Sequence, residues 1–540
     1  MILEKRQRSP LRPDFPLIRG KNKKSGLNSD RKNIPSVQRP IVRFLSSTYI
    51  VHFRGRKTDM RILEISLIVI NFGLLYWAFI ANRKSGRGPI MPLTIAFGLV
   101  IVQFAVEGGR WQMIPAYLTP LILTAYFFLG KRREGGRSRV AVTVQAVLLT
   151  VYLLVSVALP TVMPVFSFEK PTGPYAVGTT IFHWIDEQRG ESYTENPDDR
   201  RELMVQIWYP AAEGDGKKQS PYLQNASIMT GAISSKMLGL PAFTFSHLGL
   251  VKTHALLEAK LLDSESRYPV LIFSHGMNGY RNQNMYQVEE LASHGYIVVG
   301  IDYAYEAAGS VYPDGRAAMS KIGPNLTSNA KYDEHIPLWT EDATFVLNQV
   351  EQLNRNDSTG RFTGKIDIER IGMLGHSFGG AVTAQMMKKD SRVKAALSMD
   401  GGFYGPPVSE KGFGKPFFMM YSEETYNKVM ISYDDVAKQI GGGSREEFEA
   451  PRKQYIQKSG YALAGGGLSI LIPGSKHASY SDLALFSPLL GLGGADPRRD
   501  HRIVNEFSVA FFDRYLKGKD DSALQKLSAK YPEVNFKVHE

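Results

Sequence analysis

The sequence predicts two structural parts, a membrane region of about four helices followed by an α/β domain built on a mostly parallel, eight-stranded sheet. Four long apolar segments lie between basic stretches in the first third of the chain, which predicts the membrane region. From Glu169 onward, short apolar runs alternate with amphipathic stretches, which is typical of an α/β sheet. We therefore expect a leader at 1–59, a membrane region at 60–168 and an α/β domain at 169–540.

Each apolar segment has about the length of a bilayer-spanning helix, roughly 17 to 25 residues. The segments are 62–81, 90–107, 111–130 and 140–166, and Pro115 and Pro120 interrupt the third. A buried helical core is the alternative, but soluble helices seldom repeat such runs four times with basic flanks. We expect four transmembrane helices.

Lys and Arg are concentrated in the first and third connections, at 82–88 and 131–139. Basic connections stay on the cytoplasmic side, so these two are expected there. Four spans then place the α/β domain outside the cytoplasm, as part of a multi-pass protein of the cell membrane.

The leader at 1–59 conflicts with this orientation because it is strongly basic. It is rich in Pro, Ser and Asn and lacks a sustained apolar period, which predicts disorder. Our hypothesis is that the natural start is Met60. The alternative is a cytoplasmic tail with one span miscounted.

The composition narrows the classes of function. The net charge of +13 comes largely from residues before Arg139 that flank apolar segments, which favours a membrane over nucleic acid as partner. The chain has no Cys, so a disulfide or a cysteine nucleophile is excluded. No HExxH, Walker or zinc-spaced pattern occurs, and we expect neither a metal nor an organic cofactor.

The α/β domain contains eight candidate strands, of which the first two are expected to form an antiparallel edge. They are 180–186, 203–210, 269–275, 296–303, 370–376, 393–400, 416–422 and 468–473. Two connections, 211–268 and 304–335, are unusually long. Such loops either cover an active site as a lid or are packing insertions.

The run Gly375-His376-Ser377-Phe378-Gly379 matches G-x-S-x-G. The motif alone is weak evidence in a chain with 50 Gly. Here it directly follows a predicted strand and directly precedes a predicted helix, the arrangement that exposes a serine hydroxyl on a sharp turn. We predict that Ser377 is a nucleophile.

A serine hydroxyl needs a general base, most often a histidine that a carboxylate orients. Of the 11 His residues, only His477 lies in the loop directly after the last predicted strand, where this arrangement brings a base to the serine. Asp400 ends the strand after the nucleophile, whereas Glu423 and Glu424 end the next one. The chain order Ser, acid, His permits either position for the acid.

The oxyanion formed during attack needs two N–H donors. The residue after the nucleophile, Phe378, supplies one, and a loop after the third strand supplies the other. The run "SHGMNGY" at 274–280 occupies that place, and Met277 is the natural donor.

Several of these runs together resemble the isoform II group of platelet-activating factor acetylhydrolases, which are α/β hydrolases. They include "YPVLIFSHGMNGYRNQ", "IGMLGHSFGGA", "ALSMDGG" and "PGSKHASYSD", and the likeness covers about 174–516. Carried over by motif, it implies that Ser377, Asp400 and His477 form the triad, with Glu423 as a minor alternative to Asp400. The secreted members of that group lack the four preceding spans.

The resemblance implies a calcium-independent serine esterase that removes short or oxidised acyl groups from phospholipids. The expected partners are therefore an ester or phospholipid substrate and the membrane, and not nucleic acid. A general carboxylesterase or lipase is the first alternative. The second is a membrane sensor whose hydrolase-like domain binds a ligand without turning it over. The sequence does not indicate an oligomeric state.

Overall fold

The computed structural model describes residues 60–78, 90–129, 138–214, 218–322, 329–431, 445–488, 493–494 and 496–540. The predicted leader at 1–59 lies outside the described residues. So do the basic connection at 82–88 and most of the one at 131–139, on which the predicted membrane orientation depends. Residues 59–540 form one compact unit.

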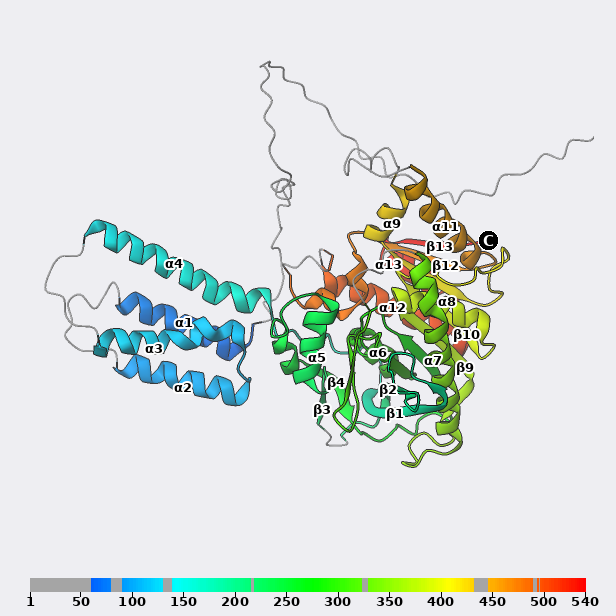
Figure 1. Ribbon diagram of the computed structural model, residues 1–540, viewed down its shortest axis with the longest axis horizontal. Helices are drawn as coiled ribbons and strands as arrows, with labels where there is room; N and C mark the ends of the chain where they lie inside the picture. The colour runs from blue at the N-terminus through cyan, green and yellow to red at the C-terminus, as the bar shows by residue number, and fades with distance from the viewer. Residues whose placement is uncertain are drawn as a thin grey trace, which may run out of the picture. The chain divides into compact units, whose positions relative to one another are not determined.

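Helices and strands alternate through most of the chain after residue 175 (Figure 1). The helices are α1 (Ile62–Tyr76), α2 (Ile90–Val106), α3 (Ile114–Leu129), α4 (Arg139–Val162), α5 (Ala226–Ala232), α6 (Met285–Ser293), α7 (Asn329–Arg355), α8 (Phe378–Lys389), α9 (Glu423–Met430), α11 (Arg445–Leu463), α12 (Pro497–Lys517) and α13 (Ala523–Lys530). The strands are β1 (Ala176–Gly190), β2 (Arg200–Ala211), β3 (Gln219–Pro221), β4 (Lys252–Leu257), β5 (Tyr268–Ser274), β6 (Ile297–Asp302), β7 (Gly309–Val311), β8 (Ala317–Met319), β9 (Ile366–His376), β10 (Val393–Met399), β11 (Phe417–Ser422), β12 (Leu468–Ile472) and β13 (Asn535–Val538).

The central sheet has eleven strands in the order β13-β12-β11-β10-β9-β5-β6-β2-β1-β4-β3, so the prediction of eight was too low. All eight predicted strands are present. The three additional ones lack a sustained apolar run, because β3 and β13 have three and four residues and β4 begins with Lys, Thr and His. The six strands β5, β6 and β9 to β12 run parallel, which confirms the mostly parallel α/β sheet.

The antiparallel pairing of the first two predicted strands, β1 and β2, is confirmed. Their position at the edge of the sheet was wrong, because β4 and β3 continue the sheet beyond β1. Both come from the insertion at 211–268. A second antiparallel strand, β13, closes the opposite edge against β12.

Helices cover both faces of the sheet because its central strands are apolar on both sides. In β5, Leu271 and Phe273 pack with α6 and α12 in one buried cluster. Val270 and Ile272 point the other way and pack with α7 and α8 in a second cluster. All seven residues of β5 are buried, as expected for a parallel strand between two helical layers.

The insertion at 211–268 is built into the fold in its described part. It supplies β3, α5 and β4, and its larger apolar side chains belong to the same buried cluster as α6 and α12. Among them are Tyr222, Met229, Ile233, Phe245 and Leu248. These contacts agree with the packing alternative for this connection.

All four predicted apolar segments form helices, and these lie side by side in Figure 1. Within the described residues, only α4, with 24 residues, is long and apolar enough to cross a membrane, so the prediction of four such helices was too high. The helices α1, α2 and α3 have 15, 17 and 16 residues. At 1.5 Å per residue they span roughly 22 to 26 Å, less than a hydrocarbon core of about 30 Å.

Candidate active site

Ser377 lies at a sharp turn between β9 and α8, as the sequence predicts. Its backbone has φ +56° and ψ −119°, an unusual conformation for a residue with a side chain. The turn requires close packing of small residues. A Cβ added to Gly375 would lie 2.2 Å from the Gly379 carbonyl oxygen, and one added to Gly379 would lie 2.1 Å from that of Ser274. Glycine at these positions is therefore what lets the strand and the helix approach.

Asp400 directly follows β10, the strand that neighbours β9. Its side chain is fully buried, and its Oδ2 lies 2.7 Å from Nδ1 of His477. His477 follows β12 and is 42% exposed, so one edge of the imidazole meets the carboxylate while part of the ring stays open. The structure thus places Asp400 and His477 together, and the resemblance had selected this pair.

Two residues that sequence reasoning did not single out hold the Asp400 carboxylate. Ser422 donates from its amide to Oδ1 at 2.9 Å and from its hydroxyl to Oδ2 at 2.8 Å. The Thr425 hydroxyl donates to Oδ2 at 2.7 Å. Burial alone would raise the pKa of Asp400, but the hydrogen bonds from His477, Ser422 and Thr425 bring it below its usual value. Asp400 is therefore charged at neutral pH.

The alternative acids, Glu423 and Glu424, do not bond the imidazole. Glu423 accepts a hydrogen bond from the Gly474 amide at 2.8 Å, and Glu424 accepts one from the backbone amide of His477 at 3.0 Å. Both carboxylates hold the backbone of the loop that carries His477. They directly follow β11, as Asp400 follows β10, which is why the sequence alone left them as candidates.

His376, next to Ser377, also supports this loop. Its Nε2 lies 3.0 Å from the His477 carbonyl oxygen, and its Nδ1 lies 2.8 Å from Nε2 of Gln283. Burial and the neighbouring His477 both lower the pKa of His376, so its ring is neutral at neutral pH. A neutral ring between an amide and a carbonyl acts as a structural bridge.

The loop after β5 lies against the serine turn. A Cβ added to Gly276 would lie 3.1 Å from Cβ of Ser377, so the backbone beside Met277 approaches the serine closely. Among the backbone hydrogen bonds of the described turns and loops, neither Met277 nor Phe378 acts as a donor. Phe378 is the first residue of α8, where an amide has no partner within the helix. Their role as oxyanion donors stays a prediction.

In the described part of the chain, no hydrogen bond joins the Ser377 hydroxyl to His477. The two side chains nevertheless belong to one small region, because the rings of His376 and His477 have their centres 4.7 Å apart. Bonds between a nucleophile and its base are often long without substrate and tighten when substrate binds.

Several known proteins are similar to this chain. A model of the family "platelet-activating factor acetylhydrolase, isoform II" matches residues 161–530. The platelet-activating factor acetylhydrolase of Cavia porcellus is 26% identical over 379 residues, covering 64% of this chain and 77% of that protein. A probable 1-alkyl-2-acetylglycerophosphocholine esterase of Arthroderma benhamiae is 26% identical over 299 residues, covering 50% of this chain and 66% of that protein.

A solved structure shares the fold. The ferulic acid esterase from Streptomyces cinnamoneus superposes with a TM-score of 0.53 at 24% identity, covering 68% of this chain and 98% of that one. Together with the mostly parallel sheet, this likeness confirms the α/β-hydrolase fold. The family match spans well over half of the chain. The chain therefore belongs to the isoform II family of platelet-activating factor acetylhydrolases, and it is a carboxylic ester hydrolase.

Proposed function

We propose that the chain hydrolyses short or oxidised acyl esters of phospholipids with Ser377 as nucleophile, His477 as base and Asp400 as the orienting acid. The observation that carries the proposal is the 2.7 Å contact between His477 Nδ1 and the buried Asp400 carboxylate, beside a serine on a strained turn. Because Asp400 accepts from Nδ1, the imidazole presents its unprotonated Nε2 as the base.

The reaction proceeds in two steps. The Ser377 oxygen attacks the ester carbonyl carbon while its proton passes to His477, and the amides of Met277 and Phe378 bind the oxyanion. His477 then gives this proton to the leaving alcohol, and an acyl-serine remains. In the second step His477 takes a proton from water, the hydroxide attacks the acyl carbon, and the proton returns to Ser377 as the fatty acid leaves.

The substrate class rests on the relatives. Their names assign acetylhydrolase activity on platelet-activating factor and esterase activity on 1-alkyl-2-acetylglycerophosphocholine. We extend this chemistry to the present chain, so that the preferred substrate is a phospholipid with an acetyl group at the second glycerol position, and this acetyl group is transferred to Ser377.

We further propose that the helices at 60–168 hold the hydrolase domain at 169–540 to a membrane, with α4 crossing it. Large apolar side chains on all four helices are exposed to the surroundings, for example Val69, Ile101, Leu121 and Leu148 at 62%, 69%, 53% and 65%. Exposed apolar surface of this extent is typical of contact with lipid. The basic stretch before α4 favours the cytoplasm for the N-terminal end of that helix, and the outer face for the hydrolase domain.

The charged groups of the α1–α4 region support this arrangement. The buried Glu64 and Arg110 form an ion pair at 2.7 Å, and Arg110 also donates to the Pro160 carbonyl oxygen at 3.3 Å, at the C-terminal end of α4. Charges paired at one end of a span avoid the hydrocarbon.

The decisive experiment uses the full chain in detergent and compares acetyl, butyryl and long-chain esters, including a phospholipid with a 2-acetyl group. Ser377→Ala serves as the control, and we expect it to lose about a thousandfold or more in kcat. Preference for the acetyl phospholipid supports the proposal. Activity on simple esters alone indicates a general esterase, and activity that survives Ser377→Ala refutes the serine mechanism.

A protease experiment tests the orientation. Protease added to intact cells should cut the hydrolase domain, with the same fragments as after lysis. Cutting only after lysis would place the domain in the cytoplasm.

A further inference from the structure

The segment that follows β6 is hydrogen-bonded to the loop that carries Met277. The Asn278 amide donates to the Glu306 carbonyl oxygen at 3.1 Å, and the Ala308 amide donates to that of Gly279 at 2.8 Å. Asn278 has φ +56°, a conformation that costs free energy unless its surroundings hold it. Residues 306–308 therefore fix the backbone on the C-terminal side of Met277.

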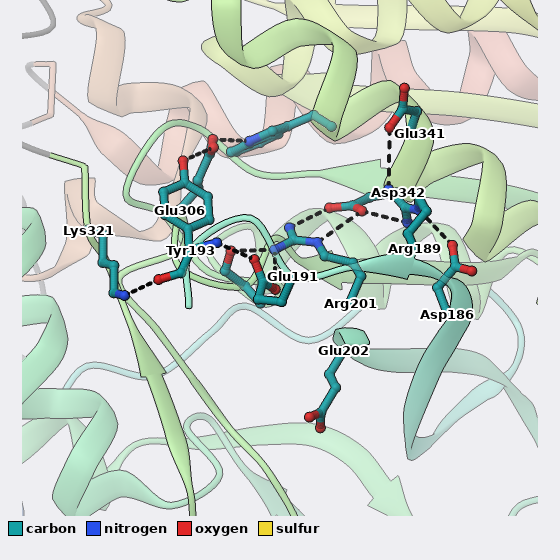
Figure 2. Close-up of polar contacts among 12 residues, drawn as sticks. Asp186, Arg189, Glu191, Tyr193, Arg201, Glu202, Glu306, Lys321, Glu341 and Asp342 are labelled. Atoms are coloured by element: carbon teal, nitrogen blue, oxygen red, sulfur yellow. Dashed lines mark hydrogen bonds and ion pairs between the residues drawn. The ribbon is translucent and has the colours of Figure 1, made fainter. Parts of the chain in front are cut away.

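The Glu306 side chain is a buried carboxylate with three donors. It is 0% exposed and accepts from the Tyr193 hydroxyl, from Trp339 Nε1 and from His335 Nδ1, the last at 2.8 Å. Tyr193 lies between β1 and β2, whereas His335 and Trp339 lie on α7. Figure 2 shows the Tyr193 hydroxyl pointing at Glu306. One carboxylate thus joins three separate parts of the chain.

The indole of Trp339 carries this connection to the second oxyanion donor. It stacks on Tyr303 with ring centres 3.6 Å apart. It also meets Phe378 edge-on, with ring centres 4.9 Å apart and an interplanar angle of 85°. Phe378 is the residue whose amide we assign to the oxyanion hole, so the contacts of Glu306 lead to Phe378 through Trp339 and to Asn278, the residue next to Met277.

A second buried network holds the same segment from the other side. Arg201 donates to the Ala304 carbonyl oxygen at 3.0 Å and forms ion pairs with Asp342 at 2.6 Å and Glu191 at 3.0 Å. Figure 2 shows this fork beside Glu306. Both networks include α7, since Asp342 lies one helical turn from Trp339. The turn at 304–306 is therefore fixed at two neighbouring points.

We propose that Glu306 is a positioning residue for the oxyanion hole, acting on Met277 through its backbone carbonyl and on Phe378 through Trp339. The carboxylate takes no part in proton transfer. This inference rests on the proposed function, because it assigns a role in the serine reaction. Its physical reason is that an amide displaced by a fraction of an ångström loses much of its bond to the oxyanion, whereas the ester in its ground state gains little from that bond.

The test compares Glu306→Gln with the wild type, each as the full chain in detergent. The Gln side chain has a single acceptor oxygen, so it cannot accept from all three donors. We expect kcat to fall at least about tenfold with little change in KM. The affinity for a trifluoromethyl ketone, which forms a tetrahedral oxyanion on the serine, should fall by a similar factor.

Two further variants control for folding. Glu202→Gln removes a carboxylate that also pairs with a histidine, His183, at 2.7 Å. Among the described contacts, Glu202 has no bond to the loop at 276–279. This variant should therefore leave kcat and the ketone affinity unchanged. Trp339→Phe keeps an aromatic ring against Phe378, removes the Nε1 donor and also makes the buried side chain smaller. It should lower kcat and ketone affinity as Glu306→Gln does, but by a smaller factor. If Glu306→Gln does not fold, Trp339→Phe serves as the test in its place.

The outcomes separate the two proposals. Loss of kcat and of ketone affinity in Glu306→Gln, with Ser377→Ala inactive, supports the inference. If kcat and ketone affinity in Glu306→Gln equal those of the wild type, the inference about Glu306 is overturned and the serine mechanism stays intact. The same holds if KM rises by the factor by which the ketone affinity falls. Activity in Ser377→Ala overturns the proposed function and this inference with it.

Discussion

His477 Nδ1 lies 2.7 Å from Oδ2 of Asp400, a fully buried carboxylate that receives three further hydrogen bonds from Ser422 and Thr425. The three bonds fix the carboxylate, and the carboxylate in turn fixes the imidazole in one tautomer. The imidazole is thus oriented by residues that lie just after β10, at the end of β11 and on α9.

Replacement of Asp400 by Asn should lower kcat by about 10⁴, because an amide no longer stabilises the imidazolium and favours the wrong tautomer. Steady-state kinetics on an acetyl ester measure the loss. Glu423→Gln is the matched control, since this carboxylate lies at the end of the next strand and bonds only the Gly474 amide among the described contacts. A larger loss in Glu423→Gln than in Asp400→Asn would exchange their roles.

Thr425→Val should remove the hydrogen bond from the residue 425 hydroxyl to Asp400, whereas Thr425→Ser keeps this hydroxyl and should keep the bond. The lost bond is to a charged group, so the expected cost in stability at neutral pH is about 1.5 to 3 kcal/mol. A carboxylate whose folded pKa is lowered contributes stability above its unfolded pKa and loses it as pH falls through the folded value. The difference between Thr425→Val and wild type in thermal unfolding should therefore shrink as the pH falls below about 4. A constant difference from neutral to acid pH would contradict this role.

Gly379→Ala should destabilise the protein and lower activity, because the new methyl group would lie 2.1 Å from the Ser274 carbonyl oxygen. Overpacking of this kind costs about 1 to 3 kcal/mol. Gly460→Ala, in α11, offers a control, since a Cβ there meets nothing within 4 Å. Alanine favours a helix interior by about 0.5 to 1 kcal/mol over glycine, so this second variant should unfold at a slightly higher temperature. Equal unfolding temperatures for the two variants would show that the turn relaxes around the methyl group.

The contact of His335 with Glu306 should make stability depend on pH. The hydrogen bond with Glu306 raises the pKa of His335 despite partial burial, and nearby Glu334 acts in the same direction. A group with a raised folded pKa contributes stability below its unfolded value, about 6.5, and loses it as pH rises through the folded value. The difference in unfolding temperature between wild type and His335→Gln should therefore be largest below about pH 6.5 and shrink as the pH rises further. A difference that grows with pH would show that the neutral ring is the stabilising form.

Val151→Arg should reduce the membrane-bound fraction of the protein, because it places a charge near the middle of α4. The cost of such a charge is about 2.5 to 3.5 kcal/mol at the centre of a span. Val140→Arg, at the N-terminal end of the same helix, should have little effect, since its side chain can reach the interface. Val151 and Val140 are 53% and 73% exposed, so neither substitution disrupts a core. Alkaline extraction of membranes measures the bound fraction, and equal extraction of both variants would mean that α4 does not span.

Local sequence patterns were sufficient for much of the fold. Eight strands of the sheet were predicted because each carries an apolar run, which is continuous in the six parallel strands because both of their faces are buried. The strands β3 and β13 were missed because they have three and four residues and take their stability from pairing with a distant neighbour. The number of membrane-spanning helices was overestimated because apolar composition predicts that a helix forms but does not fix its length. The length depends on where the turns fall.

The sequence by itself determined the serine turn, since a strand, a glycine-rich turn and a helix follow one another without a gap in the chain. It also determined the loop that carries His477, since this loop directly follows the last predicted strand. The choice among Asp400, Glu423 and Glu424 needed the tertiary structure or a family likeness, because three carboxylates at the ends of adjacent strands are equivalent in chain order. The supports of the site were likewise decided only by the fold. Glu306 and Trp339 are separated from Ser377 by 71 and 38 positions in the sequence. Trp339 reaches Phe378 because α7 packs against the serine turn, and Glu306 reaches the loop of Met277 through the Asn278 amide.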